Sequence, residues 1–268
     1  MPEFNRSLIQ RVAAAAWLSV ALAVPAGAQQ PTAPPDPGPG FMTRYEFHLS
    51  AASLAIQDQR FSWDTRFGGE LDVIDYLVGR ATILVDYEAV LGDEYRAFDP
   101  NQGNYTLETS ASARIGKTEI AGVFHHMSRH LSDRAKRFPI AWNTGGVRVL
   151  RRMTAGATTV DLAADAGRVL QHSYIDYSWI GQIDLSVRRQ LSPRVEWFAH
   201  GSAQLVGVDP SLARRDNQRG GLVETGVRLG GRAGVIELFA GFERRVDADP
   251  LDRQPQKWGL AGFRLLNH

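Results

Sequence analysis

Hydrophobic and polar residues alternate one by one through most of the chain after residue 40. In the segment 105–115, for example, Tyr105, Leu107 and Ala111 are separated by threonine, glutamate and serine. Because successive side chains of a strand point to opposite faces, this period of two predicts strands with one apolar and one polar face. Twelve such segments are predicted, at about 41–55, 61–76, 80–92, 104–116, 118–132, 139–153, 158–170, 177–191, 194–206, 218–231, 234–246 and 256–267.

The connections between these segments alternate in length. Short turns follow the even segments, most clearly at Gly116-Lys117 and Ser192-Pro193, whereas longer polar connections such as 92–103 and 207–217 follow the odd ones. An even number of long strands, with short turns on one rim and long loops on the other, is typical of outer-membrane barrels. We therefore predict an all-β fold, a 12-stranded antiparallel transmembrane β-barrel over residues 41–268. The alternative is a soluble β-sandwich, whose strands also alternate.

The first 40 residues differ from the rest of the chain. Arg6 and Arg11 precede an apolar run at 12–24, and a small-residue run ends at Ala28. This order predicts a secretory signal peptide over residues 1–28, cleaved near Ala28, and the run is too short for a transmembrane helix of about 20 residues. A buried N-terminal helix is the alternative. Residues 29–40 are rich in proline and glycine and predict a disordered leader.

Composition narrows the classes of function. The chain has no cysteine, which excludes a disulfide scaffold, a thiolate zinc site and a cysteine nucleophile. Its 30 basic and 29 acidic side chains nearly balance, so no nucleic-acid partner is expected. Most of the basic residues are arginine, which pairs well with carboxylates across a polar lumen. An acidic run at 93–101 offers oxygen ligands for a cation, although such runs are more often solvated loops.

Candidate chemistry lies in the predicted hairpin formed by segments 118–132 and 139–153. His126 and Ser128 are two residues apart and therefore share one strand face. A serine nucleophile needs a neighbouring base and a third group that orients the base, and Asn143 on the next segment is a candidate for that group. All three residues fall on the apolar, lipid-facing side by parity. If His126 lies opposite Asn143, the hairpin centre falls between Arg134 and Ala135, within the polar loop.

Polar groups are costly in lipid, so their convergence there is a functional hint. The other two histidines of this stretch have simpler interpretations. His125 has the opposite parity and is expected to be a lumen hydrogen-bonding residue, and His130 is expected to be an interfacial residue near the rim.

The stretch from His126 to Asn143 resembles the active-site hairpin of the outer-membrane phospholipase A family. That family has a His-x-Ser pair on one strand and an asparagine after a tryptophan on the next, as in Trp142-Asn143, and Ser132-Asp133 matches it as well. The resemblance implies that Ser128 is the nucleophile, His126 the base and Asn143 the orienting residue. It also implies hydrolysis of phospholipid acyl esters in the outer leaflet, a calcium requirement and a homodimer.

The chain departs from this family at two points. Arg129-His130 follows the serine where the family has Asn-Gly, and the loop before Asn143 is longer, without a serine at the expected calcium-binding position. Calcium is therefore implied by the resemblance alone, with no matched ligands. The run from His126 to Asp133 is also similar to a group of uncharacterised outer-membrane proteins.

These observations leave two classes of function. The first is an outer-membrane serine acyl hydrolase that acts on phospholipids, with a lipid A deacylase as a close variant. The second is a non-enzymatic outer-membrane barrel, either a narrow pore or a structural protein, because inward arginines and carboxylates could largely fill a twelve-stranded lumen.

Overall fold

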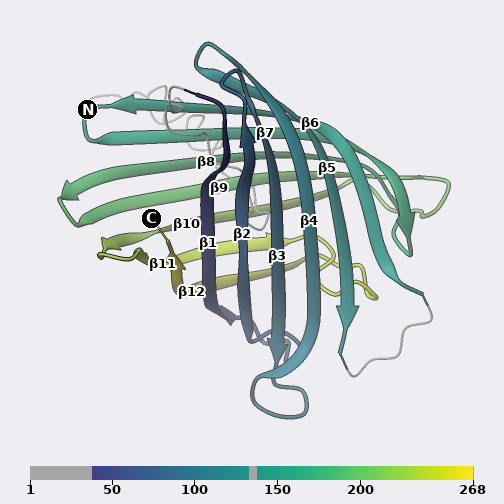
Figure 1. Ribbon diagram of the computed structural model, residues 1–268. Coiled ribbons are helices and arrows are strands. Elements are labelled where there is room, and N and C mark those ends of the chain that lie inside the picture. The colour runs from purple at the N-terminus through teal and green to yellow at the C-terminus, as the bar shows by residue number, and fades with distance from the viewer. Residues whose placement is uncertain (1–37, 133–137, 268) are drawn as a thin grey trace, which may run out of the picture.

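The computed structural model describes residues 38–132 and 138–267, which form one closed antiparallel barrel (Figure 1). Each strand pairs with its neighbours in sequence, and β1 also pairs with β12 to close the sheet. The strands are β1 (Gly40–Ala55), β2 (Trp63–Asp75), β3 (Arg80–Gly92), β4 (Asp99–Ile115), β5 (Thr118–Leu131), β6 (Ile140–Ala155), β7 (Thr158–Ser173), β8 (Tyr177–Ser192), β9 (Val195–Val208), β10 (Gln218–Gly230), β11 (Val235–Arg245) and β12 (Gln256–Leu266). In Figure 1 the strands β1–β5 cross over β8–β12 of the opposite wall, as tilted barrel strands do.

The predicted fold class and strand number are confirmed, and a two-sheet sandwich is excluded because the strands form a single closed sheet. The largest difference in bounds is at β4, which begins at Asp99 rather than near 104. Asp99 pairs with Gly92 of β3 and Gln102 pairs with Leu131 of β5. These residues are polar because they face the end of the lumen, and their polarity made them look like a loop. The predicted signal peptide and most of the predicted leader lie outside the described residues.

The two rims differ as expected. Turns after the even strands are short, such as 116–117 and 193–194, whereas 93–98, 209–217 and 246–255 are longer connections after odd strands. One connection on the long-loop rim is short, at 174–176. Among the described residues, no helix is long and apolar enough to cross a membrane.

The barrel wall is apolar outside and charged inside. On β3, for example, Ile83 and Val85 are exposed on the outer surface, while Thr82 and Asp86 are buried on the lumen side. Large apolar side chains are exposed in this way on each of the twelve strands, including Val147 of β6 and Leu265 of β12. An outward apolar band around a polar interior is the pattern of barrels whose wall contacts lipid.

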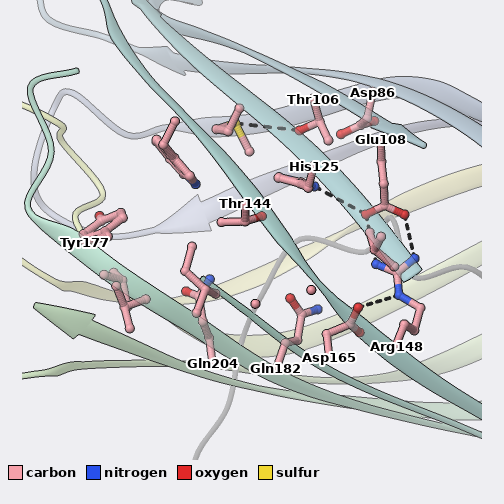
Figure 2. Close-up of a pocket in the computed structure, with 18 of the residues that line it drawn as sticks. Asp86, Thr106, Glu108, His125, Thr144, Arg148, Asp165, Tyr177, Gln182 and Gln204 are labelled. Atoms are coloured by element: carbon pink, nitrogen blue, oxygen red, sulfur yellow. Dashed lines mark hydrogen bonds and ion pairs between the residues drawn. The ribbon is translucent and has the colours of Figure 1, made fainter. Parts of the chain in front are cut away.

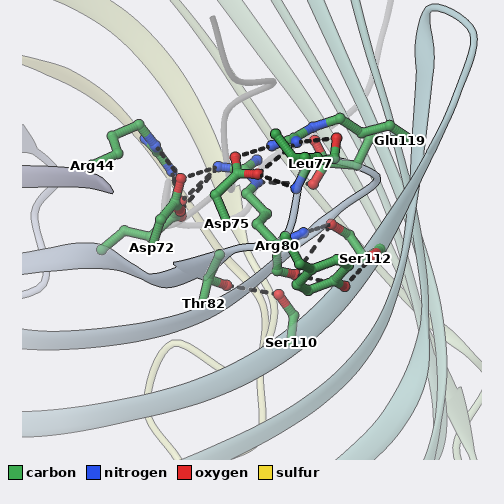
Figure 3. A network of polar contacts seen from close by, with 12 residues as sticks. Arg44, Asp72, Asp75, Leu77, Arg80, Thr82, Ser110, Ser112 and Glu119 are labelled. Carbon is green, nitrogen blue, oxygen red and sulfur yellow. Dashed lines mark hydrogen bonds and ion pairs between the residues drawn. The ribbon is translucent and has the colours of Figure 1, made fainter. Parts of the chain in front are cut away.

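Arginine–carboxylate networks fill much of the lumen. Near the short-turn end, the guanidinium of Arg80 is fully buried and donates to Asp72 at 3.1 Å and to Glu119 at 2.8 Å (Figure 3). Arg44 shares the Asp72 carboxylate, also at 3.1 Å. Buried charges need partners of this kind, since an unpaired charge removed from water is strongly destabilising.

The loop at 246–255, which we call the mouth loop, packs across the lumen at the long-loop rim. Arg129 of β5 donates to the backbone oxygens of Asp247 at 2.7 Å and Ala248 at 2.9 Å. Gln102 of β4 donates to the same Ala248 oxygen at 2.8 Å, and the Tyr177 hydroxyl of β8 donates to the Asp247 carboxylate at 2.6 Å. Side chains from three strands therefore hold this loop inward.

Arg215 ties the mouth loop to the short connection at 174–176. Its guanidinium donates to Asp176 at 2.6 Å and to Asp247 at 2.7 Å. Burial raises the pKa of a carboxyl, but the hydrogen bonds from Arg215 and the positive charges of Arg215 and Arg253 outweigh burial here. The pKa of Asp176 therefore lies below its usual value.

Candidate functional site

The β5–β6 hairpin brings two of the predicted site residues directly opposite each other. His126 pairs with Asn143. Ser128, the next residue of β5 on the same face, pairs with Ala141. The register inferred from the sequence is therefore confirmed. All three polar residues lie on the outward face, between exposed apolar side chains such as Phe124, which is 44% exposed, and Val147, which is 53% exposed.

Asn143 fixes the orientation of the His126 ring. The Nδ1 atom of His126 lies 2.6 Å from the side-chain oxygen of Asn143. An amide oxygen only accepts hydrogen bonds, so Nδ1 carries the proton and Nε2 is left as the acceptor. This is the tautomer in which an imidazole can take a proton from a serine hydroxyl.

Ser128 lies beside this pair, but its hydroxyl is turned toward another histidine. Its Oγ atom lies 3.1 Å from Nε2 of His130. Within the described part of the chain, Ser128 forms this hydrogen bond and none to His126. Residues two apart on a strand are about 7 Å apart at Cα, so a change in the side-chain rotamer of Ser128 would be needed to reach the His126 ring.

His130 ends a row of aromatic side chains that crosses the outward face of four strands. Its ring packs edge-on against Tyr105 of β4 at 5.2 Å, Tyr105 lies 4.8 Å from Tyr87 of β3, and Tyr87 lies 5.2 Å from Phe67 of β2. Aromatic side chains are enriched where a barrel wall meets the membrane interface. This row agrees with the expectation that His130 lies near the rim, although its contact with Ser128 was not foreseen.

The structure adds a fourth polar residue that the sequence reasoning missed. Asn143 donates from Nδ2 to Oε1 of Gln171 on β7, at 3.2 Å. The predicted seventh segment ended at residue 170, whereas β7 extends to Ser173. The only sequence signal was the polar run 171–173, which follows the alternating part of this segment.

The lumen face of the same hairpin is polar for structural reasons. His125 points into a cavity of about 210 Å³, and its Nδ1 lies 3.4 Å from Glu108, which confirms the lumen contact expected for it (Figure 2). Arg148 of β6 donates to Glu108 at 2.6 Å and to Asp165 at 2.5 Å. Trp142 packs edge-on against Tyr177 at 5.5 Å and supports the hairpin from inside.

The calcium requirement implied by the family resemblance has no matching cluster of carboxylate side chains among the described residues. No group of three or more histidine, aspartate or glutamate side chains that could hold a metal ion occurs in residues 38–132 and 138–267. In the acidic run at 93–101, Arg96 donates to Asp99 at 2.9 Å and Asn101 donates to Glu94 at 3.4 Å. Asp133, the residue that matches the family's Ser-Asp pair, lies outside the described residues.

No model of a known protein family matches the chain, and no curated protein matches it by sequence. Solved structures do match. The outer membrane phospholipase A of Escherichia coli has a TM-score of 0.52 and 10% identity, over 83% of this chain and 90% of that one. The calcium-bound dimer of the outer membrane phospholipase of Salmonella typhi has a TM-score of 0.51 and 10% identity, over 84% and 91%. LpxR from Salmonella typhimurium has a TM-score of 0.47 and 8% identity, over 83% and 99%.

At 10% sequence identity, the similarity to these structures concerns the fold alone. It establishes that the chain has the barrel architecture of outer-membrane proteins, including phospholipases. The candidate chemistry lies in the residues on the outward face of the β5–β6 hairpin.

Proposed function

We propose that the protein is an integral outer-membrane serine hydrolase that cleaves acyl esters of membrane phospholipids. The observation that carries this proposal is the hydrogen bond of 2.6 Å between His126 and Asn143 on the outward face, with Ser128 beside it. Polar groups on a lipid-facing wall are costly and need a reason to be there. Neighbouring structures described as outer-membrane phospholipases support both the location and the substrate class.

In the proposed reaction, Oγ of Ser128 attacks the ester carbonyl carbon and its proton moves to Nε2 of His126. The side-chain oxygen of Asn143 accepts a hydrogen bond from Nδ1–H of the resulting imidazolium and holds its orientation. The carbon–oxygen bond to the glycerol then breaks, and His126 returns the proton to the leaving oxygen. Water hydrolyses the acyl-serine with His126 again as base, which restores the Ser128 hydroxyl.

The resting geometry requires one adjustment before this reaction. Ser128 must exchange its hydrogen bond with His130 for one with His126, and such catalytic contacts are often long in the free enzyme and close on substrate binding. No step is assigned to calcium, because the described residues contain no cluster of histidine and carboxylate side chains that could hold a metal ion. The homodimer stays a prediction from the family resemblance.

The alternative class, a non-enzymatic pore, has less support. The lumen is divided by the ion cluster of Arg245, Asp64, Glu88 and Glu243, and the mouth loop packs across its long-loop end. The two cavities on either side of this cluster are each about 210 Å³. A structural barrel without activity predicts no ester cleavage at all, and the assay described next distinguishes it.

The test is ester hydrolysis by the purified barrel in detergent, with labelled phospholipid as substrate. We expect cleavage by the wild type and a loss of at least about 1,000-fold in Ser128→Ala. The matched control is Ser173→Ala, which removes an outward hydroxyl on β7 opposite Ala141 and should keep wild-type activity. Equal background rates in all three proteins would refute the hydrolase.

Two further arms refine the substrate and the metal requirement. Lipid A offered in place of phospholipid distinguishes the deacylase variant, which would release acyl chains from lipid A and leave phospholipid intact. Assays with added calcium and with a chelator test the calcium requirement that the family resemblance implies.

A further inference from the structure

The strand β7 contains an irregularity directly beside the candidate site. Val169 pairs with Thr144, and the next partner along β6, Asn143, pairs with Gln171, so Leu170 is an extra residue in the ladder. Two residues of β7 therefore lie opposite one residue of β6, which is a β-bulge. In an unbroken ladder Leu170 would lie opposite Asn143, and Gln171 would face the lumen opposite Trp142.

The bulge changes which side chain meets Asn143. Leu170 remains outward and is 65% exposed, and Gln171 now lies on the same outward face. The side chain of Leu170 lies over Gly145, where a Cβ atom would be 2.9 Å from Cδ1 of Leu170. The result is a continuous chain of hydrogen bonds from Gln171 through Asn143 to His126.

We propose that Gln171 is a positioning residue that fixes the amide orientation of Asn143 and, through it, the tautomer of His126. An asparagine amide has an accepting oxygen and a donating nitrogen, and only one orientation places its oxygen against Nδ1 of His126. Gln171 accepts from the nitrogen of Asn143, so it stabilises that orientation. The flipped amide would present a donor to Nδ1, which would leave the proton on Nε2 and remove the base.

This inference rests on the proposed hydrolase, but it makes a claim about His126 that is measurable without catalysis. The informative change is Gln171→Met, which has a similar length and lacks the accepting oxygen. Gln171→Glu is the conservative partner, because its carboxylate still accepts from Asn143. Leu170→Ala is the matched control, since it alters the exposed side chain of the bulge and leaves Gln171 in place.

The first measurement is the nitrogen chemical shifts of the His126 ring by NMR of the barrel in detergent, assigned by comparison with His126→Gln. We expect the wild type, Gln171→Glu and Leu170→Ala to carry the proton on Nδ1. In Gln171→Met a substantial fraction of His126 should carry it on Nε2. An unchanged tautomer in Gln171→Met would overturn the inference, whether or not the protein hydrolyses lipid.

The second measurement is the steady-state kinetics of ester cleavage. Loss of one hydrogen bond that holds the base should lower kcat about tenfold in Gln171→Met, with KM unchanged, and Gln171→Glu should restore most of the rate. A rise in KM with unchanged kcat would assign Gln171 to lipid binding and overturn the positioning role. Absence of activity in the wild type would refute the proposed hydrolase and leave the tautomer measurement as the test of Gln171.

Discussion

The two faces of the β5–β6 hairpin each carry a histidine in the middle of β5, and the two histidines have different surroundings. His125 points into the lumen, where Glu108, Arg148 and Asp165 form one connected set of ion pairs. His126 points outward, where its partner is the neutral side chain of Asn143 and its other neighbours are mostly apolar.

This difference distinguishes polar side chains that stabilise the barrel from polar side chains that suggest a function. Lumen charges compensate one another and fill the interior, so the stability of the barrel is reason enough for them. On the outward face, Ser128, Asn143 and Gln171 compensate no charge and interrupt an apolar wall. A hydrogen-bonded chain in that place therefore calls for a chemical explanation, whereas the denser network inside does not.

The largest expected effect comes from replacing each of the two histidines in turn, which tests whether the two faces differ in function. We expect His126→Ala to lower kcat for ester cleavage by at least about 1,000-fold, because the base is lost. His125→Ala should change kcat by less than about threefold, because it removes a lumen contact to Glu108. Both variants are measured with the same labelled phospholipid and checked for folding by circular dichroism. Similar losses in the two variants would remove the distinction between the faces.

A second prediction concerns the choice between two outward histidines. Ser128 contacts His130 in the resting structure, whereas Asn143 accepts a hydrogen bond from Nδ1 of His126 and fixes its tautomer. If His126 is the base, His130→Gln should lower kcat by less than about tenfold, which is the effect of one neutral hydrogen bond. A loss as large as that of His126→Ala would instead identify His130 as the base of Ser128.

Strand parity explains how much of this site could be predicted from the sequence. The facing of His126 and Ser128 follows from their spacing of two, and the opposition of His126 and Asn143 follows from the centre of the hairpin. These two predictions, like the prediction of twelve strands, require only that the strands pair without irregularities. Gln171 could not be predicted, because the bulge at Leu170 reverses the parity of β7 just before it.

Contacts between distant segments were also beyond the sequence. The hydrogen bonds from Arg129 to Asp247 and Ala248 join β5 to the mouth loop across more than 100 residues, and no local pattern marks them. The contact of Ser128 with His130 depends on side-chain rotamers, which spacing alone does not determine. Polar lumen residues caused the remaining error, since Asp99 and Gln102 of β4 had the composition of a loop.

The smallest predicted effect concerns the mouth loop, which lies away from the outward site. The pKa of Asp176 is below its usual value in the folded protein, because Asp176 pairs with Arg215. At pH values above about 4, the pKa of the free side chain, this pairing stabilises the folded rim in full. The stabilisation is lost as the pH falls through the lowered pKa of the folded state. The variant Asp176→Asn mimics the protonated state at every pH. At neutral pH, trypsin should cleave after Arg253 about threefold faster in this variant than in wild type, because Asp176 loses its ion pairs with Arg215 and Arg253 and such pairs are individually weak at a rim. With pepsin, the ratio of the two cleavage rates should approach one as the pH is lowered below about 4, and a ratio that stays constant with pH would show that Asp176 does not hold the loop.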